Sequence, residues 1–121
     1  MYTPSLVKGR PWEDVVEFYA DFAAKNPQFE PMYTFVSQIT ASDYGKSLFP
    51  ATSHATLFIS QVPMFEWKCQ VLEIDFDHTR QQFHFEYWGH RTVEKRWTKD
   101  CDAAEGFFTF ERFLKHRKWF G

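Results

Sequence analysis

VLEIDF at Val71–Phe76 and QFHFEYW at Gln82–Trp88, joined across a turn at Asp77–Arg80, decide the fold of this chain. Apolar and polar residues alternate in both stretches, and successive side chains of a strand point to opposite faces of a sheet. The pattern predicts an antiparallel hairpin with one apolar face, formed by Leu72, Ile74, Phe76, Phe83, Phe85 and Tyr87. The open face carries the ionisable residues Glu73, Asp75, His84 and Glu86. Such a sheet covers a core with one face only.

The turn sets which residues face each other across the hairpin. If it leaves Asp77 opposite Gln82, the register of both strands follows from the pleat. Two directly opposed pairs then form on the open face, namely Asp75 with His84 and Glu73 with Glu86. Opposed side chains lie about 4.5–5.5 Å apart at Cβ, which is close enough for a hydrogen-bonded Asp–His pair.

A third ionisable residue, His54, begins a further predicted strand, His54–Gln61. The turn after that strand brings His54 opposite Glu73 or Asp75, so that His54, Asp75 and His84 gather on neighbouring strands. A carboxylate beside a histidine raises its pKa and orients its ring, as a general base requires. Two histidines with carboxylates would also suit a zinc-like ion. A solvated polar face is the simpler alternative, because antiparallel sheets commonly have one.

Segments with helical periodicity precede and follow the predicted strands. Apolar residues at i, i+3, i+4 and i+7 predict a helix over Pro11–Lys25, and Asp102–Glu105 matches a capping box that opens a closing helix. The strands are predicted at Met32–Thr40, His54–Gln61, Glu66–Asp77, Gln82–Trp88 and Thr92–Thr98, with a loop over Ala41–Pro50. These elements predict a two-layer α+β fold: an antiparallel meander of about five strands, flat or strongly curved, with an N-terminal and a C-terminal helix on one face.

Length and composition set the class of protein. The 121 residues fit a single domain, 1–121, and 21% of them are aromatic, which is more than one small core requires. No segment has the apolar core of a signal peptide or approaches about 18 apolar residues, so we expect a cytoplasmic protein without a membrane span. Cys69 and Cys101 are too few for a disulfide scaffold and are expected to be free thiols.

Charge is unevenly distributed along the chain. Residues 1–89 hold 6 Lys and Arg against 11 Asp and Glu, whereas residues 90–121 hold 8 against 5. The basic C-terminal part is read either as a solvated face or as a surface for an acidic partner. The net charge of −2 and the acidic open face argue against a nucleic-acid partner.

Apolar residues are mixed into the predicted open face. They are Met32, Val36, Phe58, Val71 and Trp88. Apolar and charged side chains on one surface are typical of a contact surface or of a pocket lining. We therefore predict a binding surface made of His54, Phe58, Glu73, Asp75, His84, Glu86 and Trp88.

No catalytic or nucleotide-binding motif accompanies this surface. The chain contains no nucleophile elbow, no phosphate-binding glycine loop and no zinc-type cysteine spacing. The sequence therefore favours a non-catalytic interaction domain without cofactor or metal, which uses the open face for a protein partner or for a homodimer. The alternative is a small-ligand-binding or metal-assisted enzyme domain centred on His54, Asp75 and His84.

Overall fold

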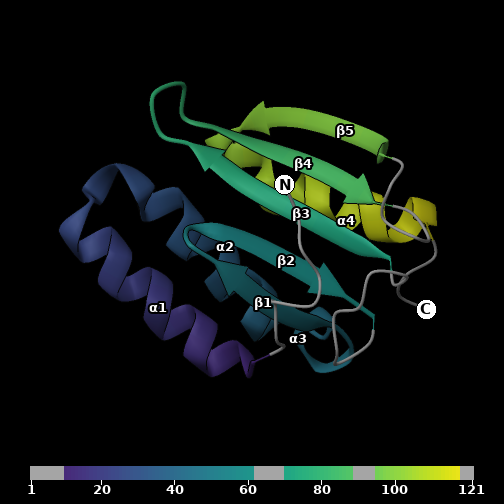
Figure 1. Cartoon of the computed structure of the whole chain (residues 1–121), viewed down its shortest axis with the longest axis horizontal. Helices are drawn as coiled ribbons and strands as arrows, with labels where there is room; N and C mark the ends of the chain where they lie inside the picture. Colours follow the sequence, from purple (N-terminus) through teal and green to yellow (C-terminus); the bar gives the residue numbers. More distant parts are fainter. Residues whose placement is uncertain (1–9, 62–69, 89–94, 118–121) are drawn as a thin grey trace.

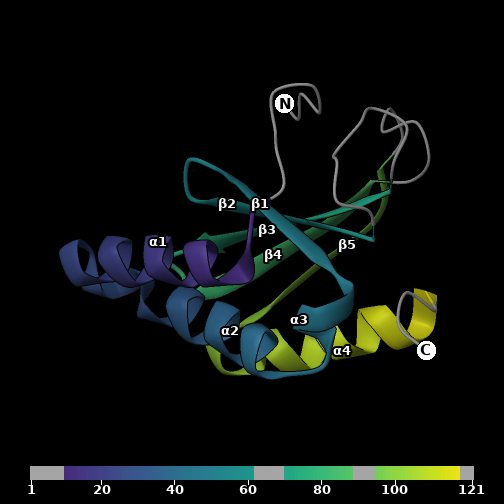
Figure 2. The ribbon, with the colours of Figure 1, turned by 90° about the horizontal axis from the view of Figure 1, so that it is seen from below.

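The computed structural model describes residues 10–61, 70–88 and 95–117. Within these ranges one five-stranded antiparallel sheet carries all the α-helices on one face, which makes two layers (Figures 1 and 2). The helices are α1 (Trp12–Lys25), α2 (Glu30–Ala41), α3 (Tyr44–Ser47) and α4 (Gly106–Arg117). The strands are β1 (Phe49–Ser53), β2 (Thr56–Ser60), β3 (Val71–Asp77), β4 (Gln82–Trp88) and β5 (Lys95–Asp102). The predicted α+β class is confirmed.

The strands follow one another in the order β1-β2-β3-β4-β5, so the predicted meander is confirmed. Its central hairpin has the predicted register, since Asp77 faces Gln82 and Asp75 faces His84. The predicted boundaries of β4 are also correct. Alternation and a short turn therefore suffice to place the hairpin that the rest of the sheet extends.

One predicted strand is a helix. Residues 32–40, expected to be the first strand, belong to α2. The segment alternates, but its apolar residues also recur at helical spacing, and it is this set that is buried: Met32, Phe35, Val36 and Ile39. Pro31 lies in the first turn, where its missing N–H is not needed, and Glu30 favours the positive end of the helix. These start signals outweigh the β-propensity of the aromatic and β-branched residues.

The true first strand, β1, lies mostly beyond the predicted loop over Ala41–Pro50, a segment that also contains α3. Pro50 suggests a loop, yet it is compatible with a strand at the edge of a sheet, where one backbone donor can be absent. The fifth strand is described from Lys95 and ends at Asp102, four residues later than predicted, and residues 92–94 lie outside the described residues. The same holds for residues 66–69 of the predicted third strand.

Aromatic side chains fill the space between the sheet and the helices. All six residues of the predicted apolar face are at most 8% exposed. Phe35 of α2 packs on Phe83 and Phe110, with ring centroids 5.0 and 5.7 Å apart, so it joins the sheet to α4. The aromatic excess of the sequence is thus largely a core property.

Side-chain hydrogen bonds hold α1 on the first hairpin. Trp12 Nε1 donates to the Leu48 carbonyl at 2.9 Å, and the Tyr19 hydroxyl donates to the Ala55 carbonyl at 3.0 Å. Both side chains are buried, and a buried donor left without a partner would be costly. These bonds position α1 along β1 and β2.

The connection from β5 to α4 depends on one close approach. Ala103–Glu105 forms a 3₁₀ turn, and the expected side-chain cap at Asp102 is not formed. A Cβ placed on Gly106 would lie 2.6 Å from the Phe83 ring, so a side chain at this position requires the ring to shift. Glycine therefore lets α4 begin directly against the sheet.

Replacing Phe85 by Ala should lower the free energy of unfolding by about 3–5 kcal/mol, because Phe85 is fully buried and a cavity would remain. Thr79→Ala in the exposed β3–β4 turn should change it by less than about 0.5 kcal/mol. Chemical denaturation measures both changes. A loss below about 1 kcal/mol for Phe85→Ala would contradict the assigned inner face.

Candidate functional site

The structure does not bring His54 into the predicted cluster with Asp75 and His84. β2 begins only at Thr56, so His54 lies in the two-residue turn between β1 and β2. Its φ is 56°. Position 58 of β2, not position 54, lies opposite Glu73. The predicted cluster of His54, Asp75 and His84 is therefore wrong for His54.

His84 is held between two carboxylates, although its cross-strand neighbour Asp75 is not one of them. Its Nε2 lies 2.9 Å from Glu86 Oε1, and its Nδ1 is hydrogen-bonded to Asp100 of β5. Asp75 instead accepts a hydrogen bond from Thr56. Partial burial lowers the pKa of His84, but the hydrogen bonds and charges of Glu86 and Asp100 outweigh it and raise the pKa above its ordinary value. The doubly bonded imidazole ring ties β4 to β5, and both of its nitrogens are engaged by carboxylates.

The second predicted pair, Glu73 opposite Glu86, has the expected register. Trp88 Nε1 donates to Glu73 Oε1 at 3.1 Å. Burial and the neighbouring Asp75 raise the pKa of Glu73, and the Trp88 hydrogen bond opposes that rise. On this face the polar side chains therefore satisfy one another.

The apolar residues expected on the open face are not available for contact. Met32 and Val36 lie on α2 in the main core. Phe58 is 5% exposed and Val71 is fully buried, in a small cluster with Ala51. The expected exposed patch of Phe58 and Val71 is therefore wrong, which removes most of the apolar area from the predicted contact surface.

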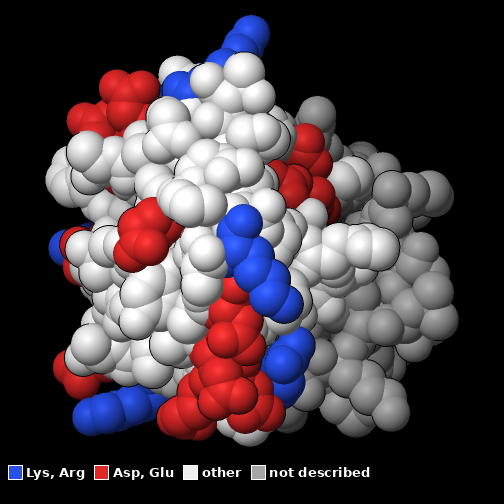
Figure 3. Space-filling model, turned by 90° about the vertical axis from the view of Figure 1, so that its left-hand side faces the viewer, with Lys and Arg blue, Asp and Glu red and all other residues white. Residues whose placement is uncertain are grey.

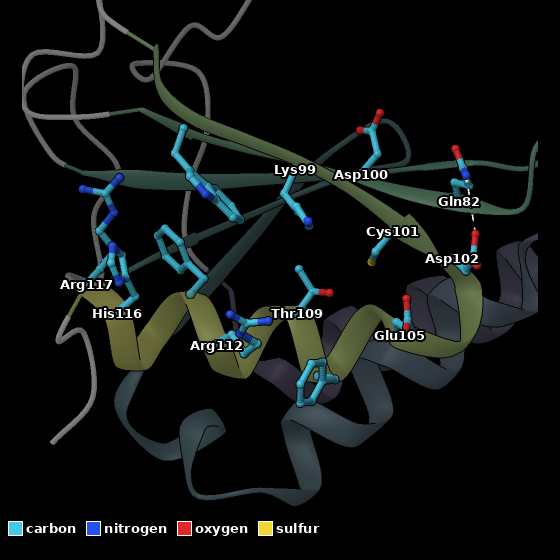
Figure 4. A pocket seen from close by; sticks show the side chains of 13 residues that line it. Gln82, Lys99, Asp100, Cys101, Asp102, Glu105, Thr109, Arg112, His116 and Arg117 are labelled. Carbon is cyan, nitrogen blue, oxygen red and sulfur yellow. Dashed lines mark hydrogen bonds between the residues drawn. The ribbon is translucent and has the colours of Figure 1, made fainter.

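A groove lies elsewhere, between β5 and α4, with a volume of about 560 Å³ (Figure 4). β5 and α4 run in opposite directions, and Trp97 packs on Phe113 with ring centroids 5.1 Å apart. In Figure 4, Lys99 and Cys101 point from β5 towards α4, whereas Asp100 points away from it. The alternation of β5 thus sends one set of its side chains into the groove.

One face of α4 borders the groove along its length. We name it the α4 stripe: Glu105, just before the helix, and Phe108, Arg112 and His116. These residues are three or four positions apart, so they lie on one side of the helix. All four are exposed, and Phe108, at 59%, is the exposed large hydrophobic side chain among the described residues. The Arg112 guanidinium lies 5.7 Å from the centre of the Phe108 ring.

β5 is also an edge strand with an open side. Its eight residues contain no proline, and among the described residues only β4 pairs with it. At the opposite edge β1 has five residues including Pro50, whose carbonyl accepts a hydrogen bond from the Arg10 backbone N–H at 3.0 Å. Arg10 Nη1 also donates to Thr52 Oγ1 at 3.0 Å. Arg10 and Pro50 therefore protect β1, whereas β5 presents unpaired backbone groups beside the groove.

Charge separates along the molecule as the sequence suggested. α1 exposes Glu13, Asp14, Glu17 and Asp21, and acidic side chains form a band towards the lower edge of the face in Figure 3. The last turn of α4 carries Lys115, His116 and Arg117, and the Arg117 guanidinium lies 4.8 Å from the centre of the Tyr87 ring. Arg112, His116 and Arg117 thus give one end of the groove a basic lining.

The groove contains no activated nucleophile. Cys101 is a free thiol at 8% exposure, and burial raises its pKa, with a hydrogen bond to Thr109 opposing the rise. A buried thiol of raised pKa is a poor nucleophile. Cys69 lies outside the described residues.

Two further observations bear on the kind of site. In the described part of the chain, no group of three or more His, Cys, Asp or Glu residues is arranged to hold a metal ion. Over the same ranges no helix has the length and apolar character needed to cross a membrane. Comparisons with protein-family models, curated proteins and solved structures give no significant match. Function must therefore be inferred from the geometry of this chain itself.

Sequence reasoning missed the groove. A usable signal was present, since Phe107, Phe110, Phe113 and Leu114 form the apolar stripe of the closing helix. Phe108 lies off that stripe, in line with Arg112. An aromatic residue on the polar side of an amphipathic helix indicates a contact surface. That the stripe borders the edge strand depends on tertiary packing and has no local signature.

Replacing His84 by Gln should remove a pH-dependent part of the stability. Because the folded pKa of His84 is raised, its contribution is fully present below the unfolded value, about 6.5, and is lost as pH rises through the folded pKa. The side chain is 39% exposed, so the effect should not exceed about 1 kcal/mol. Denaturation of both proteins from pH 6 upward measures the difference. A difference that is constant across this range would contradict the ion-paired histidine.

Proposed function

We propose that this protein is a non-catalytic interaction domain that binds an extended segment of another polypeptide along β5. The observation that carries the proposal is an eight-residue edge strand, which only β4 pairs with among the described residues, beside a groove with an exposed Phe108. An added strand would satisfy the backbone groups of β5, and its alternate side chains would enter the groove. Main-chain bonds then supply affinity, and the α4 stripe supplies selectivity.

The groove has the mixed character expected of a peptide site. Its apolar surface comes from Trp97, Phe108 and Phe113, and charged residues line the groove beside them. Aromatic and arginine side chains are the residues that most often dominate binding energy at interfaces. Its lining residues extend along α4 from Glu105 to Arg117, which suits an extended strand better than an enclosed small molecule.

The outer face of the sheet is the weaker candidate for this function. Its carboxylates and His84 are engaged with one another, and Phe58 and Val71 are buried. A partner docking there would gain little apolar area, so a homodimer or foreign partner on that face has less support than strand addition at β5.

Selection from a displayed library of random nine-residue peptides should yield binders whose Kd rises at least about tenfold with Phe108→Glu, because removing a central apolar anchor costs over 1 kcal/mol. Thr79→Glu, an exposed change in the β3–β4 turn, should leave the Kd within about twofold. Fluorescence anisotropy measures the Kd values. Amide NMR signals of Thr98–Cys101 should move on binding.

Three results would contradict the proposal. The library yields no binder, its binders are insensitive to Phe108→Glu, or the wild-type chain sediments as a dimer that Phe108→Glu converts to monomer. In the last case a second copy, not a foreign segment, occupies β5. Unfolding of the Phe108→Glu variant should match that of the wild-type protein, because the ring is exposed.

A further inference from the structure

The charges of the α4 stripe follow an order along the groove. Glu105 lies at the end where α4 begins, Phe108 follows, and Arg112 and His116 lie towards the end of the helix. Figure 4 shows Glu105 and His116 near opposite ends of the groove, with Arg112 between them. The stripe is thus acidic, then apolar, then basic.

The lining residues from other elements reinforce this order. Asp102 of β5 lies beside Glu105 at the acidic end, where Gln82 Nε2 donates to its Oδ1 at 3.4 Å. Lys99 points into the groove between the two ends, and Arg117 adds charge at the basic end. A bound segment therefore meets negative potential at one end and positive potential at the other.

The spacing of the stripe matches alternate residues of a strand. At about 1.5 Å per helical residue, Phe108, Arg112 and His116 lie about 4.5, 10.5 and 16.5 Å from Glu105 along the axis. Side chains on one face of a strand are about 6.8 Å apart, so a third such residue lies about 13.6 Å from the first. The first of these side chains on a bound strand then reaches Glu105, and the second reaches Phe108. The third reaches the space between Arg112 and His116.

The direction of the segment follows from the sheet. Every pair of neighbouring strands in it is antiparallel, and antiparallel pairing is slightly more stable per residue than parallel pairing. A segment antiparallel to β5 begins beside Asp102 and ends beside Trp97. Its N-terminal part therefore lies at the acidic end of the groove.

Building on the proposed function, we infer that the bound segment carries a basic residue, an apolar residue two positions later and an acidic residue two positions after that. The basic side chain pairs with Glu105, the apolar one packs on Phe108, and the acidic one pairs with Arg112 and His116. The intervening residues point away from α4. The partner is a polypeptide with this charge order in an extended stretch.

Two capped peptides test the charge order directly. One contains Lys-Thr-Leu-Thr-Glu and the other Glu-Thr-Leu-Thr-Lys, each between pairs of glycines, so that they share composition and net charge. At low ionic strength the first should bind about tenfold more tightly, since two attractive pairs replace two repulsive ones. The preference should shrink as salt screens the pairs. Anisotropy of labelled peptides gives both Kd values.

A charge exchange in the protein provides the matched test. Glu105→Lys combined with Arg112→Glu should weaken the first peptide and favour the second, and both positions are exposed, so the fold should persist. Exchanging Glu17→Lys with Lys25→Glu on α1 alters charges of the same kind far from the groove and should leave the preference unchanged. Thermal unfolding of each variant verifies that it is folded.

The outcomes separate the two proposals. If both peptides bind equally, or if library-selected peptides bind at Phe108 without this charge order, the inferred order is wrong and the binding function stands. If neither these peptides nor any library member binds, the proposed function itself is wrong. A preference for the first peptide that survives the Glu105 and Arg112 exchange would also overturn the inference, because it would not arise from the α4 stripe.

Discussion

The contact between Phe83 and Gly106 is the constraint on which the arrangement of β5 and α4 depends. Phe83 packs on Phe35, Phe76 and Phe85 within the core, so its ring cannot easily move aside. Only a residue without Cβ lets the chain pass this ring and begin α4 at once. The helix then returns beneath β5 in the opposite direction, and the groove is the space that these two elements leave along the edge of the sheet.

The charged residues on the outer face of the sheet and those of the α4 stripe are arranged differently. On the outer face, His84 bridges Glu86 and Asp100, and Trp88 binds Glu73, so charge serves to join neighbouring strands. Along the α4 stripe, unlike charges are separated by an aromatic ring and do not neutralise one another. Charges that are kept apart retain their potential for a partner, whereas paired charges lose most of it.

The predictable parts of the fold are those whose apolar residues fit only one periodicity, that of a strand or that of a helix. Alternation and a short turn gave the β3–β4 hairpin with its register. Residues 32–40 fit both a strand and a helix, and the start signals at Glu30 and Pro31 together with the burial of Phe35 and Ile39 select the helix. The prediction that His54 joins Asp75 and His84 was wrong because His54 lies in the two-residue turn between β1 and β2 and not in a strand. The groove could not be derived, because it depends on how β5 and α4 meet.

The contrast between the two edges of the sheet limits how many chains can join it. Among the described residues, Arg10 covers part of the β1 edge and Pro50 lacks a backbone donor, so β5 offers the longer open edge for extending the sheet. If two copies of this chain paired through β5, each would use its open edge and leave only its β1 edge, where Arg10 already bonds to Pro50 and Thr52. Pairing of this kind would stop at two molecules and would not propagate a sheet into a fibre.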